Sequence, residues 1–189
     1  METLHAIFAH VCGQVNLWSP GGETLPFCQR CTGLYVGGTW AMLAWLLARP
    51  RPTRRMLALH AAMLLLMVPF GYHWVEQGAV VRTLTGYLFA FGMVYFLALH
   101  PAHRLGRDTG ASRDALYWLL LALGAPALLA ALRFGGVRTA HFLAALGTLG
   151  LGVYGMLAAA TLLSLLPLGR GQRSRAGHSA EQRASLRLV

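Results

Sequence analysis

Five long stretches of this chain contain no Asp, Glu, Lys or Arg, and they constrain its fold more than any other feature. They cover residues 32–48, 56–74, 83–99, 115–132 and 139–168. A helix needs about 20 mostly apolar residues to cross the hydrocarbon core of a bilayer. The stretches are apolar on nearly all sides, whereas a surface helix of a soluble protein keeps one polar face. The sequence therefore predicts an all-α, polytopic membrane bundle of about five transmembrane helices.

The composition supports a membrane protein and argues against a soluble one. Hydrophobic residues make up 56% of the 189 positions and charged residues only 12%, yet the formal net charge is +10. A soluble domain usually carries about 25% charged residues. Strong basicity can indicate nucleic-acid binding, but these arginines flank the apolar stretches and show no interleaved aromatic pattern. The lipid bilayer is the expected partner, and nucleic acid is not.

The sixteen basic residues are all arginines, and their distribution predicts an orientation. Twelve lie in the first and third connections and in the C-terminal tail, and four lie in the other segments. Cytoplasmic segments of membrane proteins carry the excess of Lys and Arg. We therefore predict a multi-pass protein of the prokaryotic inner (plasma) membrane, with its N-terminus outside and its C-terminus in the cytoplasm.

This orientation divides the chain into three parts. Residues 1–31 are expected to form an extracytoplasmic Cys/His segment that caps one end of the bundle. They are not read as a signal peptide, because they lack its basic start and its uninterrupted apolar core. Residues 32–168 form the five-helix bundle. Residues 169–189 form an Arg-rich cytoplasmic tail, which we expect to be flexible.

Small and polar residues inside the stretches are assigned mainly to packing. Gly86 and Ala90, and the series Ala144, Thr148 and Gly152, repeat at four-residue spacing, which lets helices approach closely in lipid. Ordinary packing within the bundle is the favoured explanation, with a homo-oligomer face as the alternative. His60 is expected to hydrogen-bond a neighbour rather than relay protons. Pro69 and Pro126 are expected to kink the second and fourth helices.

All three cysteines occur in the first 31 residues, where they form the strongest candidate site. Cys28 and Cys31 have the two-residue gap that lets two thiolates bind one ion, and Cys12 follows His10 at a spacing that points both side chains the same way in extended backbone. A turn at residues 19–22 would bring the halves together. His10, Cys12, Cys28 and Cys31 are thus the predicted ligands, for Zn²⁺ first and copper second. A closed Cys₃His site would be structural, whereas a site with an open position would allow catalysis or metal handling, and both stay open.

Two other uses of the cysteines stay open. An oxidising compartment favours disulfides, although three cysteines would leave one thiol unpaired. Cys28 and Cys31 also fit a membrane thiol–disulfide oxidoreductase with Cys12 as its resolving thiol. The sequence therefore does not decide whether the protein is an enzyme. Arg30, between the pair, favours thiolates in either active role. An accessory or scaffold subunit with structural cysteines is the third candidate function.

Several polar residues share the predicted side of the cysteines. His73, Glu76 and Gln77 end the second stretch, and His141 begins the fifth. Four residues are the candidates for contacts around the metal ligands: Arg30, His73, Glu76 and His141. Each taken alone fits a polar residue at the membrane surface.

Three motifs resemble an uncharacterised family of multi-pass prokaryotic membrane proteins, the domain-of-unknown-function 2085 family. They are HVCGQ at 10–14, LPFCQRCTGLYVG at 25–37 and RTLTG at 82–86. The most specific is the Cys-x-Arg-Cys-Thr-Gly-x-Tyr run. The family often has Cys-His-Gln where this chain has Cys12-Gly13-Gln14, so any ligand role of that histidine would pass to His10 or be absent here. The resemblance implies an integral membrane protein whose second connection meets the cysteine segment, and it brings no established activity.

Overall fold

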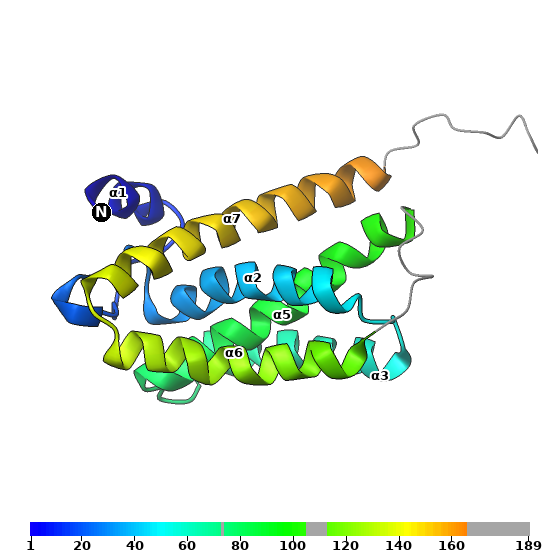
Figure 1. The fold of residues 1–189 in the computed structure, drawn as a ribbon, viewed down its shortest axis with the longest axis horizontal. Coiled ribbons are helices and arrows are strands. Elements are labelled where there is room, and N and C mark those ends of the chain that lie inside the picture. The colour runs from blue at the N-terminus through cyan, green and yellow to red at the C-terminus, as the bar shows by residue number, and fades with distance from the viewer. Residues whose placement is uncertain (73, 105–112, 166–189) are drawn as a thin grey trace, which may run out of the picture.

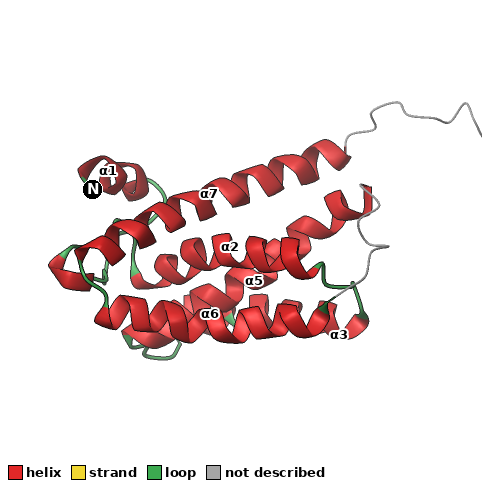
Figure 2. Cartoon of the chain, viewed as in Figure 1, coloured by secondary structure: helices red, strands yellow, loops and turns green. Residues whose placement is uncertain are grey.

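The computed structural model describes residues 1–72, 74–104 and 113–165, and these form helices joined by loops (Figures 1 and 2). The helices are α1 (Glu2–Ala9), η1 (Pro20–Gly22), α2 (Gln29–Ala48), α3 (Arg54–Leu65), α4 (Met67–Gly71), α5 (Ala79–Arg104), α6 (Asp114–Phe134) and α7 (Val137–Leu165). Five segments are long and apolar enough to cross a membrane, if α3 and α4 are taken as one. The predicted all-α fold with about five spans is therefore confirmed.

The outward faces of the spans carry large apolar side chains. Leu119 is 53% exposed, Phe142 61% and Leu162 65%. Such a surface would be unfavourable in water, because each apolar side chain left exposed forgoes about 1.5–3 kcal/mol of transfer free energy. In a bilayer the same side chains contact lipid tails, which agrees with a membrane-spanning bundle.

Helix α2 is the centre of the bundle, and α5 and α7 pack against it (Figure 1). Its crossing with α5 is close because each helix has a glycine at the contact. A Cβ atom at Gly33 would collide with the carbonyl oxygen of Thr83, and one at Gly86 would collide with that of Arg30. Small residues allow such backbone contact between membrane helices. The crossing therefore brings the start of α2 against the start of α5.

Only some of the small residues repeated at four-residue spacing pack inside the bundle. Ala90 and Ala144 are buried, together with Gly86, as the packing explanation predicted. Thr148 and Gly152 are exposed, and a Cβ atom at Gly152 would meet nothing within 4 Å. A homo-oligomer through this outer face of α7 stays a prediction.

The two prolines have different effects. The second span is divided at Leu66 into α3 and α4, three residues before Pro69, whose missing N–H leaves a carbonyl one turn earlier without a helical partner. Helix α6 continues through Pro126. In the turns before Pro126, Trp40 Nε1 and Tyr87 Oη donate hydrogen bonds to the Leu120 and Leu121 carbonyls, at 2.8 and 3.0 Å.

His60 is fully buried between α3, α5 and α6, and it hydrogen-bonds neighbours as expected. Its Nδ1 lies 2.7 Å from the Met56 carbonyl oxygen, which can only accept, so Nδ1 carries the proton. Its Nε2 then accepts from the Tyr117 hydroxyl at 2.8 Å. The ring stacks on Tyr95 at 4.0 Å between centroids. Both ring nitrogens are therefore satisfied inside the fold.

Different segments and connections lie at the two ends of the bundle. The N-terminal segment, the start of α2 and the α4–α5 and α6–α7 connections lie at one end, where the segment caps the bundle (Figure 1). The α2–α3 connection and the start of α6 lie at the other. The cysteines therefore share an end with Glu76 and the start of α7, as the sequence predicted. The predicted tail at 169–189 lies outside the described residues.

Candidate metal centre

The start of α2 positions two of the three cysteines. Cys28 is the N-cap in extended backbone, and its carbonyl accepts hydrogen bonds from the Thr32 N–H at 2.7 Å and the Thr32 hydroxyl at 3.0 Å. Cys31 lies in the first turn, because α2 begins three residues before the predicted start at residue 32. Residues three apart lie on one side of a helix, so the two thiols can approach each other.

Residues 12–28 double back on themselves and bring Cys12 to this helix start. Leu17 and Cys28 form an isolated antiparallel bridge, and the Gln29 N–H donates to the Asn16 carbonyl at 3.0 Å. The turn predicted at residues 19–22 is confirmed as η1, where Gly21 and Gly22 have φ of 62° and 85°. That left-handed backbone favours glycine, since it costs other residues energy.

A buried hydroxyl fastens this loop to two helices. The Thr83 Oγ1 of α5 accepts a hydrogen bond from Trp18 Nε1 at 2.9 Å. Its single proton is shared between the carbonyl oxygens of Gln29, at 3.0 Å, and Ala79, at 2.9 Å. Gln14 adds a second link, because its side-chain amide donates to the His5 and Pro26 carbonyls at 2.7 and 2.9 Å. The loop therefore holds Cys12 by polar contacts as well as by apolar packing.

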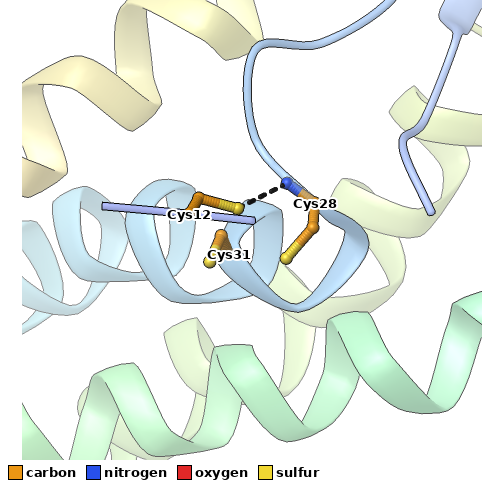
Figure 3. A group of neighbouring side chains, drawn as sticks. All are labelled: Cys12, Cys28 and Cys31. Carbon is orange, nitrogen blue, oxygen red and sulfur yellow. Dashed lines mark hydrogen bonds between the residues drawn. The ribbon is translucent and has the colours of Figure 1, made fainter. Parts of the chain in front are cut away.

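The three thiols come together as one group. The Sγ atoms of Cys12, Cys28 and Cys31 all lie within 4.8 Å of one another. Cys12 comes from the loop, whereas Cys28 and Cys31 belong to α2 (Figure 3). The Cys28 N–H donates to Cys12 Sγ at 3.2 Å (Figure 3). The sulfur of Cys12 therefore lies at the N-terminus of a 20-residue helix, where the helix dipole favours negative charge.

This environment favours the thiolate of Cys12. Hydrogen bonds from the Cys28 and Cys31 thiols, and one from the Cys28 backbone N–H, lower the pKa of Cys12 well below its ordinary value, although burial opposes them. A thiolate is the form that binds metals and attacks disulfides. The group is therefore chemically suited to both uses that the sequence left open.

His10 is not part of the three-thiol group. Residues 10–11 continue the turn at the end of α1, so the condition of extended backbone, on which the His10–Cys12 spacing argument depended, is not met there. The physical reason is local, because His10 is exposed and its Nδ1 hydrogen-bonds the Ala6 carbonyl one turn back at 2.9 Å. His10 as a fourth ligand stays a prediction.

The other candidate residues are distributed around the group. Arg30 lies beside it, and its Nη2 donates to the Phe70 carbonyl at 2.7 Å and to Gln77 Oε1 at 3.1 Å. The second connection therefore meets the cysteine end of α2, as the resemblance implied. Glu76 is exposed and lines a cavity of about 600 Å³ with Gln77 and Arg82. His141 is exposed near the start of α7. His73 lies outside the described residues.

Two residues near the thiols were not predicted as part of the site. Tyr35 lies one turn after Cys31 on α2 and is buried. The four-residue spacing was the signal that could have indicated it. Arg82 lines a cavity of about 450 Å³ together with all three cysteines and Arg30. The signal for it was the RTLTG motif at 82–86, which follows the connection that the resemblance placed against the cysteine segment, whereas its position beside the thiols depends on the α2–α5 crossing.

Comparison with known proteins supports the membrane assignment. Residues 16–96 match the model of a family described as "Predicted membrane protein (DUF2085)", which confirms the resemblance. The match includes Cys28, Arg30, Cys31 and Arg82 and begins after Cys12. No curated protein and no solved structure matches the chain.

Proposed function

We propose that this protein binds one thiophilic metal ion through Cys12, Cys28 and Cys31, with Zn²⁺ as the first candidate and copper as the second. The observation that carries the proposal is the convergence of three sulfurs within 4.8 Å from two separate segments. Sulfurs around a tetrahedral zinc ion, with bonds of about 2.3 Å, lie about 3.8 Å apart. The thiols would therefore need only small rotations to hold one ion.

The ligand number favours metal handling over a closed structural site. A structural zinc site has four protein ligands, whereas a catalytic or exchanging site keeps one position for another molecule. Three thiolates leave such a position, and the adjoining cavity gives access to it. Thiolate ligands also suit Cu(I).

Metal analysis tests this proposal. The protein is purified from membranes without chelators, reconstituted with Zn²⁺ and dialysed, and about one ion per chain is expected from a single thiolate site. Cys12→Ser, Cys28→Ser and Cys31→Ser should each lose most of the bound metal. Arg133→Gln is the control, because it changes an exposed side chain at the same end that was not predicted to contact the metal ligands. A parent protein that retains no zinc or copper would contradict the proposal.

His10→Ala decides the ligand set. Metal retained by this variant would support three protein ligands, and metal lost from it would support the predicted Cys₃His set. The variant is expected to fold, because the His10 side chain is exposed and bonded only within its own turn.

A redox function is the second candidate, and the position of the Cys28–Cys31 pair at a helix N-terminus favours it. In this reaction a thiolate of the pair attacks a disulfide in a substrate protein, and one substrate sulfur leaves as a thiol. The second cysteine then displaces the other substrate sulfur. The substrate disulfide gains two electrons and two protons and becomes two thiols, while the pair becomes a disulfide. Alkylation trapping in cells should then find both redox forms, and a pair found in one form only would contradict this function.

The membrane orientation belongs to the same proposal. We place the thiols outside the plasma membrane, because twelve of sixteen arginines belong to segments assigned to the cytoplasmic side. A membrane-impermeant thiol reagent should label metal-depleted protein in intact cells. Labelling only after lysis, with a denatured control to show that all thiols react, would reverse the orientation.

A further inference from the structure

A cavity adjoins the three thiols. Its volume is about 450 Å³, within the range of small-molecule sites. Its polar lining, besides the cysteines, consists of two arginines and three residues with amide side chains: Arg30, Arg82, Gln14, Asn16 and Gln29. Val11, Gly13 and Val15 complete the lining. Carboxylate side chains are absent from this lining within the part of the chain that the structure describes. The cavity therefore offers hydrogen-bond donors and positive charge beside the thiol group.

Both arginines retain unused donors. Arg30 is held in place through its Nη2, but its buried Nε–H has no acceptor among the described residues. A buried donor without an acceptor costs about 1–3 kcal/mol, or more when the group is charged. The half-buried Arg82 guanidinium makes no ion pair or hydrogen bond that the described residues account for. Guanidinium groups with free donors match the geometry of phosphate and carboxylate oxygens.

The charges of the site leave a place for an anion. Three thiolates and one Zn²⁺ carry a net charge of −1, and the two arginines raise it to +1. Arginine keeps its charge at every physiological pH. One arginine would be enough to neutralise the zinc–thiolate group. Glu76 is exposed and lines the neighbouring cavity with Arg82, but the described residues form no Glu76–Arg82 ion pair, so the charge of the second arginine is available to an anion.

We infer that the cavity binds a small oxyanion, a phosphate or carboxylate group, between Arg30 and Arg82, where it can occupy the open fourth position of the metal. This inference rests on the proposed metal site and names the ligand class that the site exchanges. The oxyanion can come from a soluble molecule or from the headgroup of an anionic lipid, since the cavity lies at an end of the bundle. Both sources present the same oxygens to the arginines.

Cobalt substitution provides a direct readout. Co²⁺ bound by thiolates has visible absorption bands that change when its fourth ligand changes. Titration of the Co²⁺-loaded protein in detergent with inorganic phosphate should shift these bands in a saturable way. Arg82→Gln should weaken phosphate binding about tenfold or more, because a hydrogen bond to a charged group is lost. Arg82→Lys should restore part of the affinity, and Arg133→Gln, an exposed arginine at the same end, should leave it unchanged.

The lipid source is separated by a second arm. The Co²⁺-loaded protein is placed in nanodiscs of phosphatidylcholine with or without phosphatidylglycerol. A spectral shift with phosphatidylglycerol that Arg82→Gln removes would identify a lipid headgroup, and a shift with phosphate alone would identify a soluble anion. If neither probe gives an Arg82-dependent shift, the inference is overturned.

Failure of the metal site would give a different result. If Co²⁺ does not bind at all, the proposed metal site fails, and the anion is then tested by thermal stabilisation of metal-free protein with phosphate. Stabilisation that depends on Arg82 and not on Arg133 would support the anion site without the metal. If phosphate gives no Arg82-dependent stabilisation either, both the metal site and the anion site are overturned.

Discussion

Two groups of polar side chains in the described part of the bundle, His60 and the three thiols, differ in how completely the fold satisfies them. His60 has a partner for each ring nitrogen and an aromatic ring stacked on its face. The three thiols share one backbone donor and adjoin an open cavity with two arginines. A buried polar group whose hydrogen bonds are all made mainly stabilises one fold. A group whose donor, acceptor or ligand atoms are partly unused can bind a metal ion or a small molecule. The difference separates a structural histidine from a candidate site.

The largest expected effect comes from the crossing that supports the thiol group. Gly33→Val would place a side chain against the Thr83 backbone, which cannot move without shifting α5. We expect most of the protein to misfold and both buried groups to be lost, measured by gel filtration in detergent and by metal content. Gly152→Val is the matched control, because its new side chain would meet open space. A well-folded, metal-binding Gly33→Val protein would show that the close crossing does not position the site.

The second prediction separates the histidine from the thiols. Tyr117→Phe removes the hydroxyl that donates to His60 Nε2, and the free energy of unfolding should fall by about 1–3 kcal/mol because a buried acceptor is left unsatisfied. Metal content should stay unchanged. Equilibrium unfolding in detergent measures the first effect, and Tyr72→Phe, with a 72% exposed side chain, is the control. Metal loss in Tyr117→Phe would mean that the two regions are coupled.

The smallest effect is expected from the loop that holds Cys12. Thr83→Val keeps the shape of the side chain but removes the acceptor of Trp18 Nε1, which should cost about 1 kcal/mol. Cys12 in metal-free protein should then be alkylated faster, as followed by mass spectrometry of its peptide. Thr148→Val is the control, since that hydroxyl bonds only to Ala144 in its own helix. Equal alkylation rates would show that this link does not hold the loop.

The helices followed from the sequence because their cause is local. A run of about 20 apolar residues must satisfy its backbone hydrogen bonds within itself when it lies in lipid, and only a helix does this with a single segment. Helix starts were less well predicted. Cys31 was assigned to the segment before the first span, whereas α2 begins at Gln29 with Cys28 as its N-cap residue.

The candidate site was predicted in part for the same reason. The proximity of Cys28 and Cys31 follows from a spacing of three, and the return of Cys12 follows from a turn marked by Pro20 and two glycines. His10 was predicted as a ligand from a spacing that brings it beside Cys12 only in extended backbone. The turn at the end of α1 takes the place of that conformation. Arg82 lies 51 residues after Cys31, so only long-range packing brings it to the thiols.

The chain by itself therefore determined that this is a basic, five-span helical membrane protein with all its cysteines at one end. Apolar run length, arginine placement and turn residues act over a few positions, and a reader of the sequence can evaluate them. The tertiary structure alone decided that three thiols meet without His10, and that two arginines share their cavity. Those outcomes depend on the glycine contact between α2 and α5, because backbone approach sets which distant side chains can touch.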